Sequence, residues 1–239
     1  MQMPGSPAMG ERPAIIEAAA TPQQARRVYD LWSHFYGWWA PLFECRPQML
    51  ALERAAIRPH DHVLEVAVGA GGVLVEILRL VDPANVVSGI DVSPKMLAKA
   101  RRRVTDAGYS NVDLQEADAR SLPFPDNAFD VLFNSYMFDL LPLKDISVVL
   151  DQFHRVLKPG GRLVLVNMSK EHGDKRTWWE RLYQSLPRSC AAYVLGSCRP
   201  VLLESFVRAA RFCRVKREFI RGILPSEIVS AKKPEQRRG

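Results

Sequence analysis

A glycine-rich turn follows the first apolar, strand-like run of the chain, and its residue types are suited to holding a ligand close to the backbone. It reads Glu65-Val66-Ala67-Val68-Gly69-Ala70-Gly71-Gly72. Small residues let the backbone approach a ligand, and the start of the following helix offers unpaired N–H groups to an anion. A dinucleotide fingerprint would place a third glycine where Leu74 stands, and a P-loop would need a lysine that is missing. Binding of a nicotinamide cofactor is therefore disfavoured, and a P-loop is excluded.

Two carboxylates follow the next two strand-like runs. Asp91 comes twenty residues after Gly71 and ends a strand, where a carboxylate can accept hydrogen bonds from both hydroxyls of a ribose. Its alternative role is to cap the following helix, for which Ser93 is the better residue. Asp118 follows the third strand and is placed to accept a hydrogen bond from the exocyclic amine of an adenine. The alternative for Asp118 is an ordinary loop aspartate.

The elements that must position these groups alternate along the chain. We expect strands at 62–68, 86–91, 112–115, 129–134 and 162–167, separated by helices at 73–81, 94–107 and 143–157 or by turns. The last of these helices should end at Lys158-Pro159-Gly160-Gly161. A helix at 200–210 and a hairpin of strands at 214–220 and 227–231 would complete the sheet with an antiparallel strand. The pattern predicts a doubly wound α/β fold with a mostly parallel, seven-stranded sheet.

Composition narrows the class of protein further. The chain has 239 residues, of which 47% are hydrophobic and 25% charged, as in an ordinary globular protein. Its four cysteines lack CxxC spacing, so we expect neither a zinc site nor a redox dithiol. No run approaches the ~18 apolar residues that a membrane-spanning helix needs, and the N-terminus has no secretory pattern. These features predict a cytoplasmic protein without a metal.

Five motifs occur in order along the middle of the chain. They are Glu65-x-Ala67-x-Gly69-x-Gly71, the run 89–97, Asp118-Ala119 with Leu122-Pro123-Phe124, Phe129-Asp130, and the run 157–163. Together they resemble the motifs of class I S-adenosylmethionine-dependent methyltransferases, in the subgroup of ubiquinone/menaquinone C-methyltransferases. The resemblance is strong over 62–168 and looser over 25–61 and 199–234. It departs from the family at Ala67, where glycine is usual, and at Ala70, where threonine is frequent.

The resemblance implies a Rossmann-like fold with an N-terminal helical lid, and S-adenosyl-L-methionine as cofactor. It places the loop glycines beside the methionine part of the cofactor, Asp91 on the ribose, Asp118 on the amino edge of adenine and Asn134 beside the sulfur. The cofactor-binding residues that it implies are Tyr36, Glu65, Gly69, Ala70, Gly71, Asp91, Val92, Met96, Asp118, Ala119 and Asn134.

Methyl transfer from such a cofactor requires little chemical activation by the protein. A sulfonium methyl group is already activated, so the enzyme has to align a nucleophile with the C–S bond and exclude water. A phenol, a quinol carbon or a protonated amine would also need a general base. His34 and Asp139 are the candidates, with His172 as a third, although each could be structural and Asp139 could cap the helix that follows it.

Two segments rich in aromatic residues point to the acceptor. Seven of the fifteen residues at 29–43 are aromatic, and Trp178 and Trp179 lie in the segment after the fifth strand. These segments predict an apolar lid over a quinol or phospholipid amine, unless they pack on each other as core. Residues 199–239 hold eleven Lys/Arg against four Asp/Glu, so they carry the whole net charge of +7. This basic segment predicts peripheral contact with an anionic membrane surface, unless it is only a solvated face.

The same features divide the chain and define alternative functions. We expect a disordered lead-in at 1–21, a helical lid at 22–58, the cofactor-binding core at 59–168, a substrate-side insertion at 169–198, a helix and hairpin at 199–234 and a tail at 235–239. Methylation of bases in nucleic acids is disfavoured because no N/D-P-P-Y/F motif follows the fourth strand. A non-catalytic protein that binds S-adenosylmethionine and regulates or contacts other proteins is the alternative, favoured only by Ala67.

Overall fold

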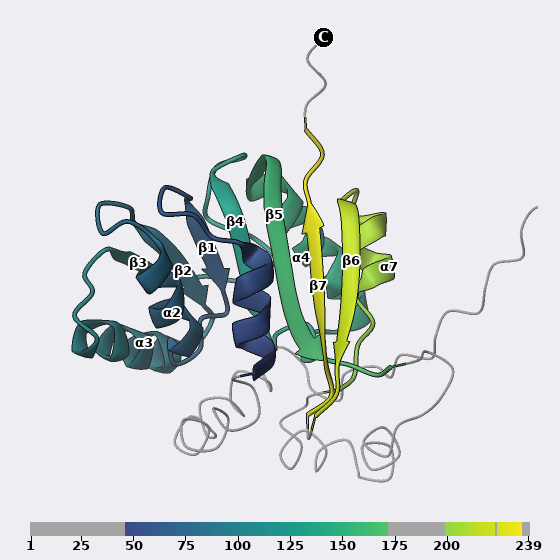
Figure 1. Cartoon of the computed structure of the whole chain (residues 1–239), viewed down its shortest axis with the longest axis horizontal. Helices are drawn as coiled ribbons and strands as arrows, with labels where there is room; N and C mark the ends of the chain where they lie inside the picture. The colour runs from purple at the N-terminus through teal and green to yellow at the C-terminus, as the bar shows by residue number, and fades with distance from the viewer. Residues whose placement is uncertain (1–45, 172–198, 223, 236–239) are drawn as a thin grey trace, which may run out of the picture.

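One mixed sheet organises the residues that the computed structural model describes, which are 46–171, 199–222 and 224–235. Seven strands of this part of the chain form it in the order β3-β2-β1-β4-β5-β7-β6 (Figure 1). The strands are β1 (Val63–Val66), β2 (Val87–Asp91), β3 (Val112–Glu116), β4 (Phe129–Ser135), β5 (Leu157–Met168), β6 (Cys213–Ile220) and β7 (Ser226–Lys232). The helices between them are α2 (Gly72–Leu80), α3 (Pro94–Asp106), α4 (Leu143–Val156) and α7 (Glu204–Ala209).

The first five strands run parallel, and the hairpin of β6 and β7 is added antiparallel. Strand β1 pairs with β2 on one side and with β4 on the other, so the chain reverses its direction of winding beside β1. Strand β7 lies between β5 and β6 and is antiparallel to both. The predicted doubly wound, mostly parallel sheet of seven strands is confirmed.

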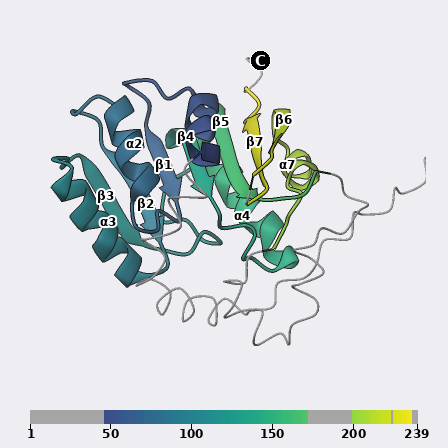
Figure 2. The ribbon, with the colours of Figure 1, turned by 60° about the horizontal axis from the view of Figure 1, so that its bottom comes forward.

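Helices cover both faces of the sheet, as Figure 2 shows from a second direction. On one face α2, α3 and a further helix over 46–55 pack on apolar side chains such as Phe133 and Val164. On the other face α4 and α7 pack on a second cluster that includes Leu132 and Val229. Alternate residues of a strand point to opposite faces, so β4 contributes to both clusters. The core therefore consists of two apolar layers separated by the sheet.

A local signal sets where helix α3 begins. The hydroxyl of Ser93 accepts a hydrogen bond from the backbone N–H of Met96 and Pro94 occupies the first position of α3, as the sequence predicted. Helix α4 carries its buried residues on one stripe, and its N-terminus, like those of α2 and α7, has no side-chain cap. The buried residues of that stripe are Ile146, Val149, Leu150, Phe153 and Val156.

Two predicted boundaries were wrong, both because of contacts with distant segments. Strand β5 begins at Leu157 instead of residue 162, since the backbone of Gly160 and Gly161 pairs with Lys233 beyond the end of β7. Helix α7 begins at Glu204 instead of residue 200. The backbone N–H of Val201 donates to the carbonyl of Met168, which keeps this stretch extended beside the end of β5.

Of the segment 22–58, the structure describes residues 46–58. Residues 46–55 form a helix that packs on the sheet. Ala51, Leu52 and Ala55 are buried in the same cluster as α2, and Arg54 forms an ion pair with Glu218 of β6 at 2.7 Å. Residues 1–45 and 172–198 lie outside the described residues. They include the expected lead-in and most of the expected lid and insertion. Among the helices that are described, none is both long and apolar enough to cross a membrane.

Candidate functional site

The predicted ligand residues meet at the carboxyl ends of β1 and β2, next to the point where the winding of the sheet reverses. In doubly wound folds this edge is where ligands bind. Asp91 ends β2 and is 9% exposed. One oxygen of its carboxylate accepts from the backbone N–H of Gly69 and the other from that of Ser93, each at 2.9 Å. The carboxylate is therefore oriented at the edge of the sheet where, in doubly wound folds, such a group accepts from the hydroxyls of a ribose.

The loop after β1 follows a left-handed backbone path. Ala67, Gly69 and Gly71 have φ of 59°, 53° and 77°. A Cβ on Gly71 would lie 2.9 Å from Cα of Ala100 in α3, so a side chain there would force the helices apart. A Cβ on Gly69 would meet no atom within 4 Å. The backbone at Gly69 therefore borders open space in which a ligand can approach it.

Glu65 lies beneath this loop near the end of β1. Its side chain is buried, and its Oε2 has no hydrogen-bond partner among the described residues. Burial raises the pKa of Glu65 well above its usual range, and the negative charge of Asp91 raises it further. A buried carboxyl group with an unsatisfied oxygen is costly, so a cationic or hydrogen-bonding ligand group at this position would stabilise its charged form.

Asp118, after β3, is held by Arg120, which the sequence motifs did not indicate as a site residue. Arg120 donates to the Asp118 carboxylate from its backbone N–H, from Nε and from Nη2, and its Nη1 reaches Asp145 in the first turn of α4 at 3.1 Å. The hydrogen bonds from Arg120 hold the pKa of Asp118 below its usual value. The Asp-x-Arg spacing was a visible signal, but the contact with Asp145 spans 25 residues.

Three further predicted residues lie at the same edge. Asn134, near the end of β4, donates to the carbonyl of Val66 at 2.8 Å, and its Oδ1 has no partner among the described residues. Val92 is 43% exposed although it is apolar, whereas Met96 is buried beside it in α3. An exposed valine next to Asp91 is the kind of surface on which a flat ring can pack. The structure thus brings together the predicted residues of β1, β2, β3 and β4.

The candidate bases fall into two groups. Asp139 is fully buried in the connection between β4 and α4, and its backbone carbonyl accepts from the N–H of Arg199 at 3.3 Å. The N-cap of α4 is Pro142 without a side-chain hydrogen bond, so the alternative that Asp139 caps this helix was wrong. The other two candidate bases, His34 and His172, lie outside the described residues, as does the predicted cofactor-binding residue Tyr36.

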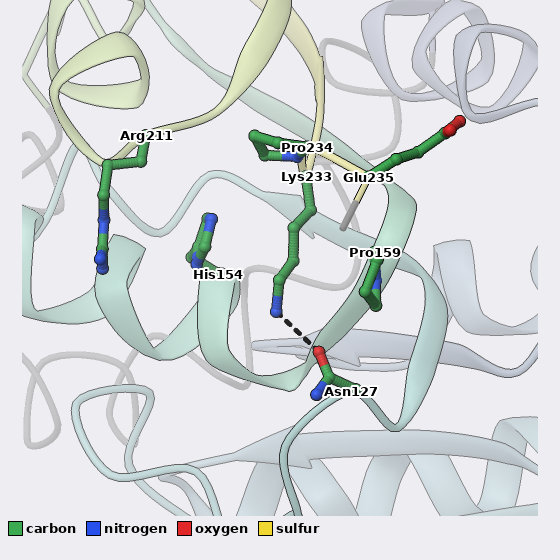
Figure 3. A pocket seen from close by; sticks show the side chains of 7 residues that line it. All are labelled: Asn127, His154, Pro159, Arg211, Lys233, Pro234 and Glu235. Carbon is green, nitrogen blue, oxygen red and sulfur yellow. Dashed lines mark hydrogen bonds between the residues drawn. The ribbon is translucent and has the colours of Figure 1, made fainter. Parts of the chain in front are cut away.

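The described residues also line a pocket of about 370 Å³, on the opposite edge of the sheet (Figure 3). Its residues come from the end of α4, the turns before β4 and after α7, the start of β5 and the chain after β7, and Lys233 donates to Asn127 inside it at 2.8 Å. Lys233 also donates to the carbonyl of Leu157 at 2.8 Å, so it closes the end of α4. This pocket is separate from the candidate site. Within the described part of the chain no group of His, Cys, Asp and Glu could hold a metal ion.

The segment that carries this site is similar to known methyltransferase sequences. Residues 63–161 match a family model described as a methyltransferase domain. The ubiquinone/menaquinone biosynthesis C-methyltransferase UbiE of Teredinibacter turnerae is 39% identical over 120 residues, which are 50% of this chain and 47% of that protein. Demethylmenaquinone methyltransferase of Symbiobacterium thermophilum is 40% identical over 114 residues, or 47% of this chain and 45% of that protein. The chain spans about half the length of these relatives.

Solved structures agree on the fold. The [4+2]-cyclase SpnF superposes with a TM-score of 0.74 at 22% identity, over 94% of this chain and 100% of that chain. A protein of Thermotoga maritima described as a possible histamine N-methyltransferase superposes with a TM-score of 0.62 at 19% identity, over 87% and 99% of the two chains. At these identities the likeness shows the fold alone, which is the Rossmann-like fold of class I methyltransferases.

The site fits the cofactor of such domains, S-adenosyl-L-methionine. The open space at Gly69 suits close approach of its methionine part, and the unsatisfied Oε2 of Glu65 lies beneath that loop. Asp91 places a carboxylate at the end of β2, where a ribose would bind, and Val92 offers an exposed apolar surface for adenine. The chemistry of these residues therefore matches a ligand with an ammonium group, a ribose and a purine.

Proposed function

We propose that this chain is a class I S-adenosylmethionine-dependent methyltransferase and that it methylates a ring carbon of a quinol. The observation that carries the acceptor class is the 36–40% identity of the core to ubiquinone/menaquinone C-methyltransferases and a demethylmenaquinone methyltransferase. These relatives match about half of their own length, so the acceptor is an inference from the shared core. A phospholipid amine has no comparable support among them.

The residues of the core would divide the work of holding the cofactor. When bound, S-adenosylmethionine supplies an activated methyl group on a sulfonium. Asp91 would accept from the ribose hydroxyls while its bond to Gly69 keeps the glycine loop in place. Glu65 would face the cationic amino-acid part. Asn134 would lie beside the sulfur, with its side chain oriented by the bond to Val66.

Proton removal is the step that the acceptor would demand from the protein. The ring carbons of a quinol become more nucleophilic once a hydroxyl loses its proton, and the ring C–H proton must leave after methyl transfer, so a base near the acceptor would assist both steps. Asp139 and His34 remain our candidates. Asp139 is fully buried, so as the base it would act away from bulk water.

The noncatalytic alternative rested on Ala67, and the backbone there weakens it. Ala67 keeps the left-handed conformation, with φ of 59°, that a glycine would adopt freely. The methyl group of Ala67 is therefore compatible with a left-handed backbone at this position of the loop. We regard Ala67 as a strained substitute for glycine within a working cofactor site.

The basic segment supports a place of action at a membrane surface, where a quinol with an apolar tail would dissolve. Arg208 and Arg211 belong to α7 and the turn after it, Arg214 and Lys216 to the edge strand β6, and Arg221 to the turn that follows (Figure 1). All five are exposed. We propose that this edge of the sheet contacts anionic lipid.

A transfer assay tests the proposed function. Purified full-length protein is incubated with methyl-labelled S-adenosylmethionine and, separately, a reduced prenylated naphthoquinone that lacks the ring methyl group, or phosphatidylethanolamine vesicles. We expect labelled quinol and S-adenosylhomocysteine only in the first reaction, and loss of both with Asp91→Asn but not with Asp113→Asn, an exposed carboxylate of β3. Label in the phospholipid, or cofactor binding without turnover on the quinol, would overturn the acceptor.

A further inference from the structure

Arg120 connects the loop after β3 with the first turn of α4. Its guanidinium lies between two carboxylates, 2.5 Å from Oδ2 of Asp118 and 3.1 Å from Oδ2 of Asp145. Asp145 is 13% exposed in its side chain and belongs to a helix whose apolar stripe is fully buried. Arg120 is therefore anchored on a rigid element, while Asp118 lies in a loop without helix or strand.

The arginine leaves one side of the Asp118 carboxylate available. Oδ1 accepts from the backbone N–H of Arg120 at 2.9 Å and Oδ2 accepts from Nη2 at 2.5 Å, while Nε lies between them, 3.0 Å from Oδ1 and 3.1 Å from Oδ2. All of these donors belong to Arg120, so the orientation of the carboxylate is fixed from one side. The Asp118 side chain is 42% exposed, so its other side can be reached from outside. An exocyclic amine can donate an N–H to this exposed side.

The position of Asp118 agrees with this use. Strands β2 and β3 are parallel neighbours in which Asp91 is aligned with Glu116, and Asp118 follows two residues later. The backbone N–H of Ala117 donates to the carbonyl of Asp91 at 3.2 Å, which joins the two strand ends. A nucleoside whose ribose lies on Asp91 would therefore extend its base toward the loop that carries Asp118.

We propose that Arg120 is a positioning residue for adenine recognition, which holds the Asp118 carboxylate so that its exposed side faces the exocyclic amine. This inference rests on the proposed cofactor. Arg120 touches neither the base nor the reacting atoms. The contact with Asp145 fixes Arg120 relative to α4, and Arg120 in turn fixes the loop that carries Asp118. The low pKa of Asp118 keeps its carboxylate ionised, so that it acts only as an acceptor.

The test compares two nucleosides that differ at the base edge. Calorimetry measures the affinity of the full chain for S-adenosylhomocysteine and for S-inosylhomocysteine, in which an oxygen replaces the exocyclic amine. Loss of a hydrogen bond to a charged acceptor should make the wild-type protein prefer the adenine compound by about tenfold or more. In Arg120→Ala the preference should fall to about threefold or less, because Asp118 is no longer held.

Matched variants separate positioning from a general effect on the fold. Arg79→Ala removes an exposed arginine that pairs with Glu76 on α2, and should leave the preference unchanged. Arg120→Lys keeps the charge but cannot donate from a planar fork, so it should give an intermediate preference. An undiminished preference in folded Arg120→Ala would overturn the proposal. Failure of the quinol assay would leave this preference intact, whereas failure to bind either nucleoside would overturn the cofactor and this proposal together.

Discussion

The carboxylate of Asp91 accepts a hydrogen bond from the backbone N–H of Gly69 at 2.9 Å, which joins the end of β2 to the loop after β1. The same carboxylate accepts from the N–H of Ser93 and so also orders the start of α3. One side chain thereby organises both the loop and the helix that border the candidate site. Replacing it should affect binding more than the loss of two ligand contacts alone.

We expect Asp91→Ala to weaken binding of S-adenosylmethionine and S-adenosylhomocysteine sharply. Each charge-assisted hydrogen bond that is lost contributes about 1.5–3 kcal/mol. Calorimetry on the variant, with Asp113→Ala as a control for an exposed carboxylate on β3, measures the difference. Unchanged affinity in a folded Asp91→Ala protein would contradict the assignment of the cofactor site.

Ala67→Gly should stabilise the protein and keep or tighten cofactor binding. A left-handed conformation costs a residue with a Cβ about 1–2 kcal/mol, and the added freedom of glycine in the unfolded chain offsets about 0.4–1 kcal/mol of this. Urea denaturation should therefore show a gain of about 0.5–1 kcal/mol. Gly71→Ala is the opposing control, because its Cβ would lie 2.9 Å from Cα of Ala100. Destabilisation by Ala67→Gly would mean that the loop has repacked around the methyl group.

The stability of the ligand-free protein should depend on pH through Glu65. Burial and the charge of Asp91 raise the pKa of Glu65 above its usual 4.5, so the folded state retains a proton that the unfolded state releases. The contribution of that proton to stability is complete below the usual value and is lost as the pH rises through the pKa of the folded state.

Glu65→Gln cannot ionise, and the variant should gain stability relative to the wild type as the pH rises above 4.5, by at most about 1.4 kcal/mol per pH unit. Urea denaturation between pH 5 and pH 8 measures this difference. Glu76→Gln, at a half-buried position of α2, serves as the control for loss of a carboxylate away from the site. A constant difference between Glu65→Gln and the wild type over this pH range would show that Glu65 is ionised in the folded protein.

Two arginine–glutamate pairs of β6 should differ widely in their effect on stability. Arg217 contacts Glu227 at 2.5 Å where the glutamate side chain is fully buried, whereas Arg54 contacts Glu218 at 2.7 Å where both are about 40% exposed. Arg217→Ala leaves a buried carboxylate without its cation and should cost about 3–5 kcal/mol, whereas Arg54→Ala removes a solvent-exposed ion pair and should cost much less. Urea denaturation of both variants compares them, and equal costs would contradict the role of burial.

The exposed basic residues at the β6 edge should bind anionic vesicles at low salt. Each lysine or arginine near such a surface contributes about 1 kcal/mol, and salt screens the attraction over about 8 Å at physiological ionic strength. Vesicle sedimentation should show binding that falls as salt rises, and a weaker attraction for Arg214→Glu with Lys216→Glu. Trp32→Ala and Trp178→Ala should weaken the binding that persists at high salt. Absence of binding at every salt concentration, with full activity on a small soluble acceptor, would contradict the membrane proposal.

The amino-acid sequence alone was sufficient to predict the parallel core of the sheet. It also indicated where most of the candidate site residues lie along the chain. The strands ending at Val66 and Asp91 and the helix starting at Pro94 were predicted to within a few residues, because apolar periodicity and caps act over short stretches of chain. The positions of Asp91 and Asp118 followed from the rule that ligands bind at the carboxyl ends of parallel strands. Such signals are local, and each can be read before the chain folds.

Only the tertiary structure decided the features that depend on residues far apart in the chain. The early start of β5 requires Lys233, the link from Arg120 to Asp145 crosses 25 residues, and the burial of Glu227 depends on Arg217 and on the N–H of Leu203. The left-handed backbone at Ala67 was equally hidden, since alanine by itself disfavours it. Backbone pairing and burial are imposed by neighbours that meet only after folding, and local composition does not record them.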